Sequence, residues 1–316
     1  FPYTTLFRSL NATADLKTHI PSRLSLTGRL GKRYAARIDY TLEPMQQRNF
    51  NFSYMFQYND INIYEKGNRA YNTTYKYHLA EFGFSDVWYK NFRFGLGLRF
   101  EYYKYKDFLF KQPELIDLKV ESEHFLSYFA QIHYNTYDKG YFPAKGSDFK
   151  AAYSLYTDNM AQYNEHAPFS ALSASWASVL PITRRFSVIP SIYGRILIGR
   201  NFPYPLQNAI GGEVPGFYIP QQLPFAGVNN IELMDNAIMI ASLKFRQRMG
   251  AIHYLILTGN YGLTDSHFFK ILKGKQLFGI SAGYGMDSVF GPLEISLGYS
   301  NQADKASCFV NLGYYF

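Results

Sequence analysis

The sequence contains a single cysteine, Cys308, and nowhere a run of about 18 consecutive apolar residues. One cysteine cannot form an intramolecular disulfide, so a disulfide-stapled secreted domain is excluded. The absence of a long apolar run excludes an ordinary transmembrane helix. The seven histidines are dispersed without metal-ligand spacing, so we expect neither a metal site nor a cofactor.

Clustered charge is also missing. Lys and Arg number 32 against 24 Asp and Glu, a net charge of +8 that could indicate binding to nucleic acid. The basic residues are scattered singly rather than gathered in a patch, so we do not expect nucleic acid as a partner.

Aromatic side chains are abundant, with 29 Tyr and 28 Phe, and they recur at every second position. A β-strand points successive side chains to opposite faces, so such a segment has one apolar and one polar side. Tyr and Phe at the ends of the apolar face are typical of aromatic girdles at two lipid interfaces. The clearest example is the segment 94–102, whose apolar face carries Phe94, Leu96, Leu98, Phe100 and Tyr102.

This alternation predicts an all-β fold, a transmembrane antiparallel β-barrel. Single-chain bacterial barrels have an even number of strands, so we expect sixteen, with the first lost from this chain. The predicted strands are 11–19, 23–30, 33–42, 49–58, 75–89, 92–105, 124–137, 148–157, 169–180, 186–199, 237–248, 252–263, 277–287, 292–300 and 307–316.

The connections between these strands alternate in length. Short turns are predicted at 20–22, 43–48, 89–91, 181–185, 249–251 and 289–291. Longer loops are predicted at 59–74, 106–123, 158–168, 201–236 and 264–276. Outer-membrane barrels have short periplasmic turns and long outer loops, so we expect the C-terminus to face the periplasm.

The first nine residues, FPYTTLFRS, look like the translation of a sequencing-library adapter. We interpret residues 1–9 as a cloning or assembly artefact and residues 10–316 as one outer-membrane β-barrel domain. On this interpretation the natural N-terminus is missing, and an upstream domain could precede the barrel.

The segment 283–293, GYGMDSVFGPL, is followed by a strand, a short loop and a final aromatic strand. This arrangement resembles the end of BamA/TamA-type barrels, the bacterial surface antigen family. The segment 138–146, DKGYFPAKG, is similar to the family's periplasmic turn, in which an aromatic-Pro-x-x-Gly run precedes the next strand. The resemblance implies a location in the outer membrane of a Gram-negative bacterium.

The loop 201–236 occupies the place of the family's inward-folded loop, in which a glycine-rich start leads to an apolar-Arg-Gly-aromatic tetrad. Here Pro215 stands where the Arg belongs, in the run Gly211, Gly212, Glu213, Val214, Pro215, Gly216 and Phe217. We expect the loop to fold inward with the charges reversed, so that the loop supplies the anion and the wall supplies the cation. A salt bridge from Glu213 and packing of Phe217 would then hold the loop. The predicted cations of the lumen wall are Arg195, Lys244, Arg246 and Arg248.

The run 279–283, GISAG, matches the G-x-S-x-G pattern of nucleophilic serines, which patatins use. A nucleophile elbow requires a strand, a strained turn and a helix, whereas this run lies inside one alternating strand with Ser281 inward. We therefore predict no catalytic residue and no enzyme activity for this chain. The small inward residues around Ser281 would leave room for the inserted loop or allow tight strand curvature.

The inward charges Arg37, Asp39, Arg99 and Glu101 are expected to form a mutually paired lumen wall rather than transport determinants. Tyr314 and Phe316 end the chain as the terminal insertion signal read by the outer-membrane assembly machinery. That machinery is one expected partner, and outer-membrane lipid and lipopolysaccharide are the others.

The sequences of 51–60 and 220–227 look most like the C-terminal barrel of patatin-like phospholipases, in which a soluble lipase precedes the barrel. The resemblance implies an anchoring or secretion module for an N-terminal passenger domain. An outer-membrane assembly or translocation factor is the first alternative, and a passive diffusion pore is the second.

Overall fold

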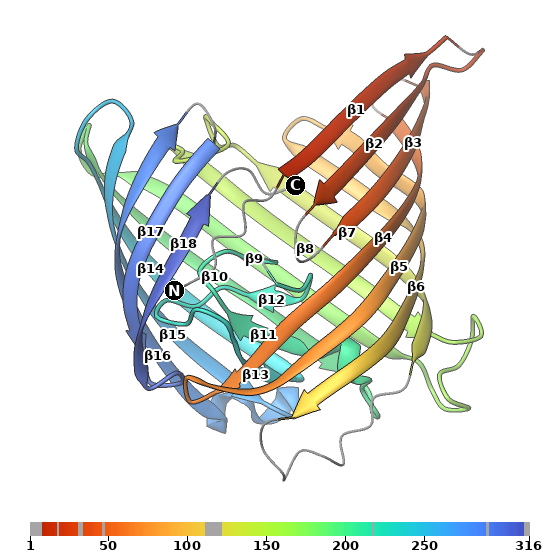
Figure 1. Cartoon of the computed structure of the whole chain (residues 1–316). Coiled ribbons are helices and arrows are strands. Elements are labelled where there is room, and N and C mark those ends of the chain that lie inside the picture. Colours follow the sequence, from red (N-terminus) through yellow and green to blue (C-terminus); the bar gives the residue numbers. More distant parts are fainter. Residues whose placement is uncertain are drawn as a thin grey trace.

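The computed structural model describes residues 8–17, 19–30, 34–45, 48–110, 122–216, 218–288 and 291–312. Fifteen strands follow one another as antiparallel neighbours and tilt around a common axis (Figure 1). They are β1 (Arg8–Leu16), β2 (Ser22–Leu30), β3 (Ala35–Met45), β4 (Arg48–Glu65), β5 (Asn68–Tyr89), β6 (Phe92–Phe110), β7 (Glu123–Asn135), β8 (Gly146–Thr157), β9 (Phe169–Pro181), β10 (Phe186–Ile198), β14 (Ala237–Arg248), β15 (His253–Asp265), β16 (Lys275–Ser288), β17 (Gly291–Ser300) and β18 (Lys305–Leu312).

Every predicted strand corresponds to one of these fifteen, which confirms the all-β antiparallel barrel. The pairing runs from β1 to β10, passes directly from β10 to β14, and continues to β18. Among the described residues no pairing joins β1 to β18, and a sixteenth strand stays a prediction. β1 includes Arg8 and Ser9 of the segment interpreted as an artefact. Tyr314 and Phe316 lie outside the described residues.

Side-chain exposure follows the predicted alternation. On β6, Leu96 is 56% exposed on the outer face, whereas Glu101 and Tyr103 are buried on the inner face. On β17, Leu297 is 64% exposed, and its inward neighbour Ser296 is buried. On these two strands the apolar side therefore faces outward, as a lipid-facing wall requires.

The predicted loop 59–74 is wrong: β4 and β5 continue through it and meet in a two-residue turn at Lys66 and Gly67. Both turn residues have positive φ, 48° and 71°, the backbone of the tight turn that matches strand twist. The alternation inverts here, with apolar Ile61 and Ile63 buried inward and polar residues outward. Strands with polar residues outside and apolar residues inside suit a hairpin that projects beyond the lipid into water. A rule that looks for outward apolar faces therefore does not recognise these segments as strands.

Beneath this hairpin, the end of the barrel that carries the longer loops is filled by a mostly aromatic core, which we call the mouth cluster. Its rings are in direct contact; Tyr156 and Phe169, for example, stack with centroids 5.1 Å apart. The hairpin tip reaches the β17–β18 turn, where Lys305 Nζ donates to Asn68 Oδ1 at 2.7 Å. The principal members of the mouth cluster are Ile61, Ile63, Tyr71, Tyr75, Tyr77, Tyr103, Phe125, Tyr156, Phe169, Leu206, Ile219 and Ile231.

The helical elements of the described chain are two short 3-10 segments, η2 (Tyr204–Leu206) and η3 (Phe268–Lys273). In the described ranges, no helix is long and apolar enough to cross a membrane.

Candidate functional site: a loop folded into the lumen

The connection between β10 and β14 folds into the space enclosed by the strands (Figure 1). It contains η2 and three short strands, β11 (Asn208–Gly211), β12 (Gln222–Leu223) and β13 (Ile231–Asp235). β11 pairs with both β12 and β13, and β13 reaches the barrel wall through a pairing of Ile231 with Ile63 of β4. The loop is thus a small sheet of its own, attached to both sides of the barrel.

Asn208 holds the two ends of the loop together. Its Nδ2 donates to the carbonyl oxygen of Arg195 at 2.8 Å and to that of Asn236 at 2.7 Å. Arg195 donates in turn to the carbonyl oxygen of Leu206 at 2.7 Å and to Asn208 Oδ1. Asn208 is fully buried, so losing these bonds would leave a buried amide unpaired.

The middle of the loop rests on glycines of β16 and β17. A Cβ atom at Gly279 would lie 2.2 Å from the carbonyl oxygen of Ala226, and one at Gly298 would lie 2.7 Å from Gly227 Cα. Phe225 is only 1% exposed and fills the space beside Gly279. These contacts, between Gly279 and Gly298 on the wall and 225–227 on the loop, form what we call the glycine seat. Small inward residues were expected either to leave room for the loop or to allow tight strand curvature. The structure shows that they leave room for the loop.

The residues of the altered tetrad lie beside the seat. Gly211 and Gly212 are buried, and Pro215 and Gly216 are exposed. Val214 is bound through its carbonyl oxygen, which accepts from Gln222 Nε2 at 3.1 Å. Phe217, the fourth tetrad position, lies outside the described residues.

Glu213 accepts hydrogen bonds from Ser281 Oγ at 3.1 Å and from the amide of Gly227 at 3.4 Å. The expected salt bridge is wrong, because no ion pair between described residues includes Glu213. Burial raises the pKa of Glu213, which lies in the loop and outside the membrane-spanning strands. The hydrogen bond from Ser281 and the positive charge of Lys244 oppose that shift.

Two more of the predicted wall cations, Arg246 and Arg248, bind carbonyl oxygens rather than the loop's carboxylate, whereas the positive charge of Lys244 acts on Glu213. Arg246 is buried and donates to the carbonyl oxygen of Pro143. Arg248 is exposed at the strand end and donates to Gly250 and Ala251 of the β14–β15 turn, so it is not part of the lumen wall. Peptide oxygens accept the hydrogen bonds of these guanidinium groups, which therefore have partners without a carboxylate from the loop.

Pro143 belongs to the turn between β7 and β8, which contacts the opposite wall at the other end of the barrel. Phe142 stacks on Tyr254 with ring centroids 4.5 Å apart, and Lys139 Nζ lies 3.1 Å from Asp287 Oδ2. The sequence 138–146 resembled a family turn, but its reach across the lumen had no signal in the sequence.

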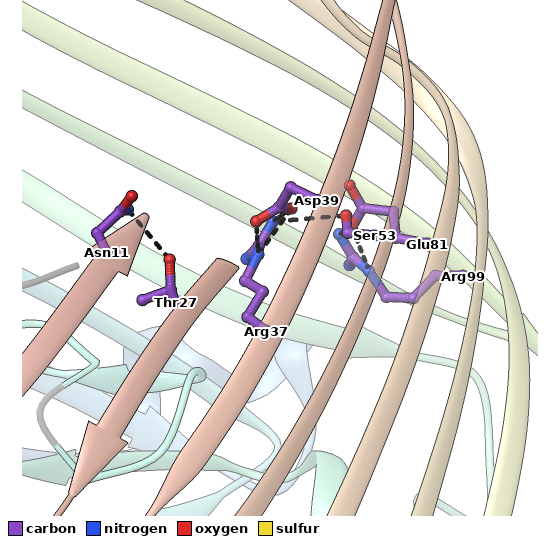
Figure 2. A network of polar contacts seen from close by, with 7 residues as sticks. All are labelled: Asn11, Thr27, Arg37, Asp39, Ser53, Glu81 and Arg99. Carbon is purple, nitrogen blue, oxygen red and sulfur yellow. Dashed lines mark hydrogen bonds and ion pairs between the residues drawn. The ribbon is translucent and has the colours of Figure 1, made fainter. Parts of the chain in front are cut away.

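The inner face of the wall formed by β1 to β6 carries a row of polar side chains (Figure 2). Arg37 Nε donates to Asp39 Oδ1 at 2.8 Å, and Arg99 Nη2 donates to Glu81 Oε2 at 2.7 Å. Glu101, expected among these pairs, instead accepts from Tyr77 Oη at 2.6 Å. The charges of this wall thus have partners on the same strand or on a neighbouring one, which matches a paired wall more closely than a set of free transport ligands.

Ser281 does not lie in the strand-turn-helix setting of a nucleophilic serine. Ser281 lies inside β16, paired with Thr258 and Gly298 on the adjoining strands, and its hydroxyl donates to Glu213. No group of three His, Cys, Asp or Glu side chains in the described part of the chain could hold a metal ion. What the arrangement can do is hold a loop in the lumen by hydrogen bonds and close packing alone.

Sequence reasoning missed Asn208, Gln222 and Phe225. Gln222 is 2% exposed and donates to the carbonyl oxygens of Gly211 and Val214, which closes the tetrad segment on itself. The only signal was the run 220–227, PQQLPFAG, quoted for its family resemblance rather than for its contacts.

Gly279→Val is expected to displace the loop from the glycine seat, because the added side chain would occupy the place of Ala226. Overpacking of this kind costs about 1–3 kcal/mol. Limited proteolysis of the refolded barrel should then cut within 211–228 much faster than in the wild type. Gly259→Val is the matched control, because a Cβ there meets nothing within 4 Å. Equal protection of the loop in both variants would contradict the seat.

Solved structures of similar fold come from outer-membrane barrels. BamA from Haemophilus ducreyi lacking POTRA domains 1–3 has a TM-score of 0.72 and 14% identity, covering 95% of this chain and 65% of that one. CdiB from Escherichia coli has a TM-score of 0.62 and 13% identity, covering 92% of this chain and 55% of that one. CdiB from Acinetobacter baumannii has a TM-score of 0.58 and 11% identity, covering 98% of this chain and 59% of that one.

At these identities the likeness concerns the fold, and this chain spans about 55–65% of those three chains. No curated protein sequence matches the chain significantly. The family model of the OMP85 superfamily matches residues 42–316, which is most of the chain. With its inward-folded loop and lipid-facing strands, the chain belongs to the OMP85 superfamily of outer-membrane barrels.

Proposed function

We propose that this barrel anchors and secretes a soluble domain that precedes it on the same polypeptide, and that this domain is a patatin-like phospholipase. The observation that carries the secretion part is a lumen plugged at one end by non-covalent contacts. The inserted loop rests on the glycine seat, and the hairpin tip is tied to the loop where the amide of Gly67 donates to Glu232 Oε2 at 3.1 Å. Such a closure can be released and restored.

The closed lumen argues against the passive diffusion pore. A diffusion pore needs a water-filled passage, whereas the mouth cluster fills one end of this barrel with buried rings. Secretion requires only that the loop and hairpin move when a substrate engages. The passenger's identity rests on the resemblance of 51–60 and 220–227 to barrels behind patatin-like phospholipases.

The proposed orientation places the C-terminus in the periplasm and the β4–β5 hairpin outside the cell. It is supported by the loop lengths at the two ends, although the hairpin at 66–67 is shorter than expected. Insertion would use the assembly machinery, with the aromatic end at Tyr314 and Phe316 as its signal.

The coding sequence upstream of Leu10 distinguishes the passenger from its alternative. A glycine-rich core with its own G-x-S-x-G in a strand-turn-helix context would support the phospholipase. Tandem small α/β repeats would instead favour the assembly or translocation factor. If the upstream sequence held neither feature, both the phospholipase passenger and the assembly factor would be ruled out.

Secretion through the lumen predicts that fixing the loop stops export. In a Cys308→Ser background, Glu213→Cys and Ser281→Cys place two thiols where the native side chains touch at 3.1 Å. A short, reducible bifunctional thiol reagent should then abolish surface display of the full-length protein's passenger, and reduction should restore it.

Each single-cysteine variant treated with the same reagent is the control, since it carries the modification without the bridge. Undiminished display with the loop bridged would contradict passage through the lumen and leave only an anchoring role.

A further inference from the structure

The loop between β15 and β16 folds back over the outer surface of the barrel rather than into the lumen. Its η3 segment buries Ile271, 4% exposed, against Ile196 of β10, Ala237 of β14 and Leu263 of β15. Those three positions belong to the lipid-facing side, because each is two residues from an exposed apolar side chain on its own strand: Ile198 at 43%, Met239 at 39% and Tyr261 at 39%. A turn of helix therefore lies on the outside wall, at the rim where the longer loops emerge.

The two most exposed large apolar side chains of the described residues are in this segment: Phe269 at 93% and Leu272 at 80%. They adjoin the lipid-facing belt, which at this end carries Tyr261 and Phe278, themselves 39% and 52% exposed. Bare apolar surface of this kind marks an interaction with a membrane or a protein. Its continuity with the lipid-facing belt selects the membrane.

A 3-10 helix has three residues per turn, so side chains three apart lie on one line. The sequence FFKILK therefore has three separate faces. Phe268 and Ile271 share the first, and Ile271 packs on the barrel. The second carries Phe269 and Leu272, and the third carries Lys270 and Lys273. Each face is chemically uniform, as an interfacial anchor requires.

The lysines make this face strongly positive. Both are exposed, no acidic residue lies in the first turn, and His267 and Lys275 flank the segment. The neighbouring Asp265 is engaged, since its Oδ1 accepts from the amide of His267 at 2.7 Å. The Cα atoms of the two lysines are separated by a rise of about 6 Å along the axis, so their like charges repel each other and both side chains can reach one anion.

We infer that η3 is a lipopolysaccharide-binding anchor: Phe269 and Leu272 enter the acyl layer of the outer leaflet, and Lys270 and Lys273 bind a phosphate of lipid A. The inference rests on the proposed orientation, which puts this rim on the outer leaflet. It does not depend on what the barrel secretes. The doubly phosphorylated glycolipid suits a paired cation better than a phospholipid with one negative charge.

The first test measures lipid A bound to the purified full chain by native mass spectrometry, after titration in detergent with lipid A, phosphatidylglycerol or inorganic phosphate. Lys270→Gln with Lys273→Gln should weaken lipid A binding about 30-fold, since each lysine near an anionic surface contributes about 1 kcal/mol. Phosphatidylglycerol and phosphate should bind the wild type far more weakly.

Arg184→Gln with Arg185→Gln is the matched control, because it removes two exposed cations from the β9–β10 turn at the other rim. It should leave lipid A binding unchanged. Equal binding by the wild type and the double lysine variant would overturn the inference. So would phosphatidylglycerol binding as tightly as lipid A.

The second test measures insertion. Phe269→Trp in a Trp88→Phe, Trp176→Phe background should be quenched by lipids brominated near the headgroup, in vesicles containing lipid A. Glu65→Trp at the exposed hairpin tip is the control and should be quenched by aqueous iodide instead. Quenching of Phe269→Trp by iodide alone would overturn the insertion.

Topology is read separately. In a Cys308→Ser background, an impermeant maleimide should label Ser266→Cys on intact cells and should not label Thr183→Cys. The reverse pattern would refute the orientation, and with it the choice of lipid A, while leaving the secretion experiment with the bridged loop unaffected.

Discussion

Leu96→Arg should lower the barrel's free energy of unfolding by about 2–4 kcal/mol, because it places a charge in the middle of the lipid-facing wall. Leu96 is 56% exposed on the outer face of β6, between Phe94 and Leu98 on the same face. A guanidinium there must leave water for hydrocarbon or drag water and headgroups inward. Urea titration of the chain folded in lipid vesicles, followed by tryptophan fluorescence, measures the loss.

Gln131→Arg provides the matched control. Gln131 pairs with Gly95, next to Leu96, but lies exposed on the inner face of β7, where a cation stays hydrated. Its cost should be below about 1 kcal/mol. Gly97 also faces inward but cannot serve as the control position, since a Cβ there would lie 2.3 Å from the carbonyl oxygen of Phe82. Equal losses for Leu96→Arg and Gln131→Arg would contradict the assignment of inside and outside.

The strands were predictable because a membrane imposes one rule on all of them. Wherever a strand crosses lipid, its outer face must be apolar, so the alternating pattern of segments such as 94–102 and 292–300 identifies them as strands. The rule ends where the lipid ends. Beyond it, β4 turns Ile61 and Ile63 inward, where they form part of the mouth cluster, and shows polar residues outward. That pattern reads as a loop when the membrane rule is applied to it.

The site was predictable in its position but not in its bonds. Loop length and the glycines at 211 and 212 indicated insertion, and small inward residues indicated a space for it. The salt bridge failed because electrostatic reasoning from sequence counts only side-chain charges. In the structure Arg195 binds the carbonyl oxygen of Leu206 in the following loop, and Arg246 binds that of Pro143, which is distant in sequence. The fold decides which backbone oxygens lie within reach of a cation, and the residue types do not predict this.

Phe225→Ala should detach the loop and cost about 3–5 kcal/mol, the usual loss for removing a fully buried Phe ring. The ring is 1% exposed and packs with Ile210, Ile238 and Leu277 in a cluster between loop and wall. Two of the wall positions that the ring touches are glycines, Gly262 and Gly279, and neither can fill the cavity that its loss leaves. Hydrogen exchange of 208–235 should therefore accelerate together with the fall in unfolding free energy.

Phe278→Ala removes the same ring from the strand that carries Gly279, but from the opposite face, where it is 52% exposed. Lipid or detergent can occupy the space it leaves, so the loss should be well below that of Phe225→Ala, and exchange in 208–235 should not change. If Phe225→Ala lowered stability while the loop stayed protected, the ring would belong to the wall's core alone. The closure of the lumen would then depend on the hydrogen bonds of Asn208, Gln222 and Glu213 rather than on packing.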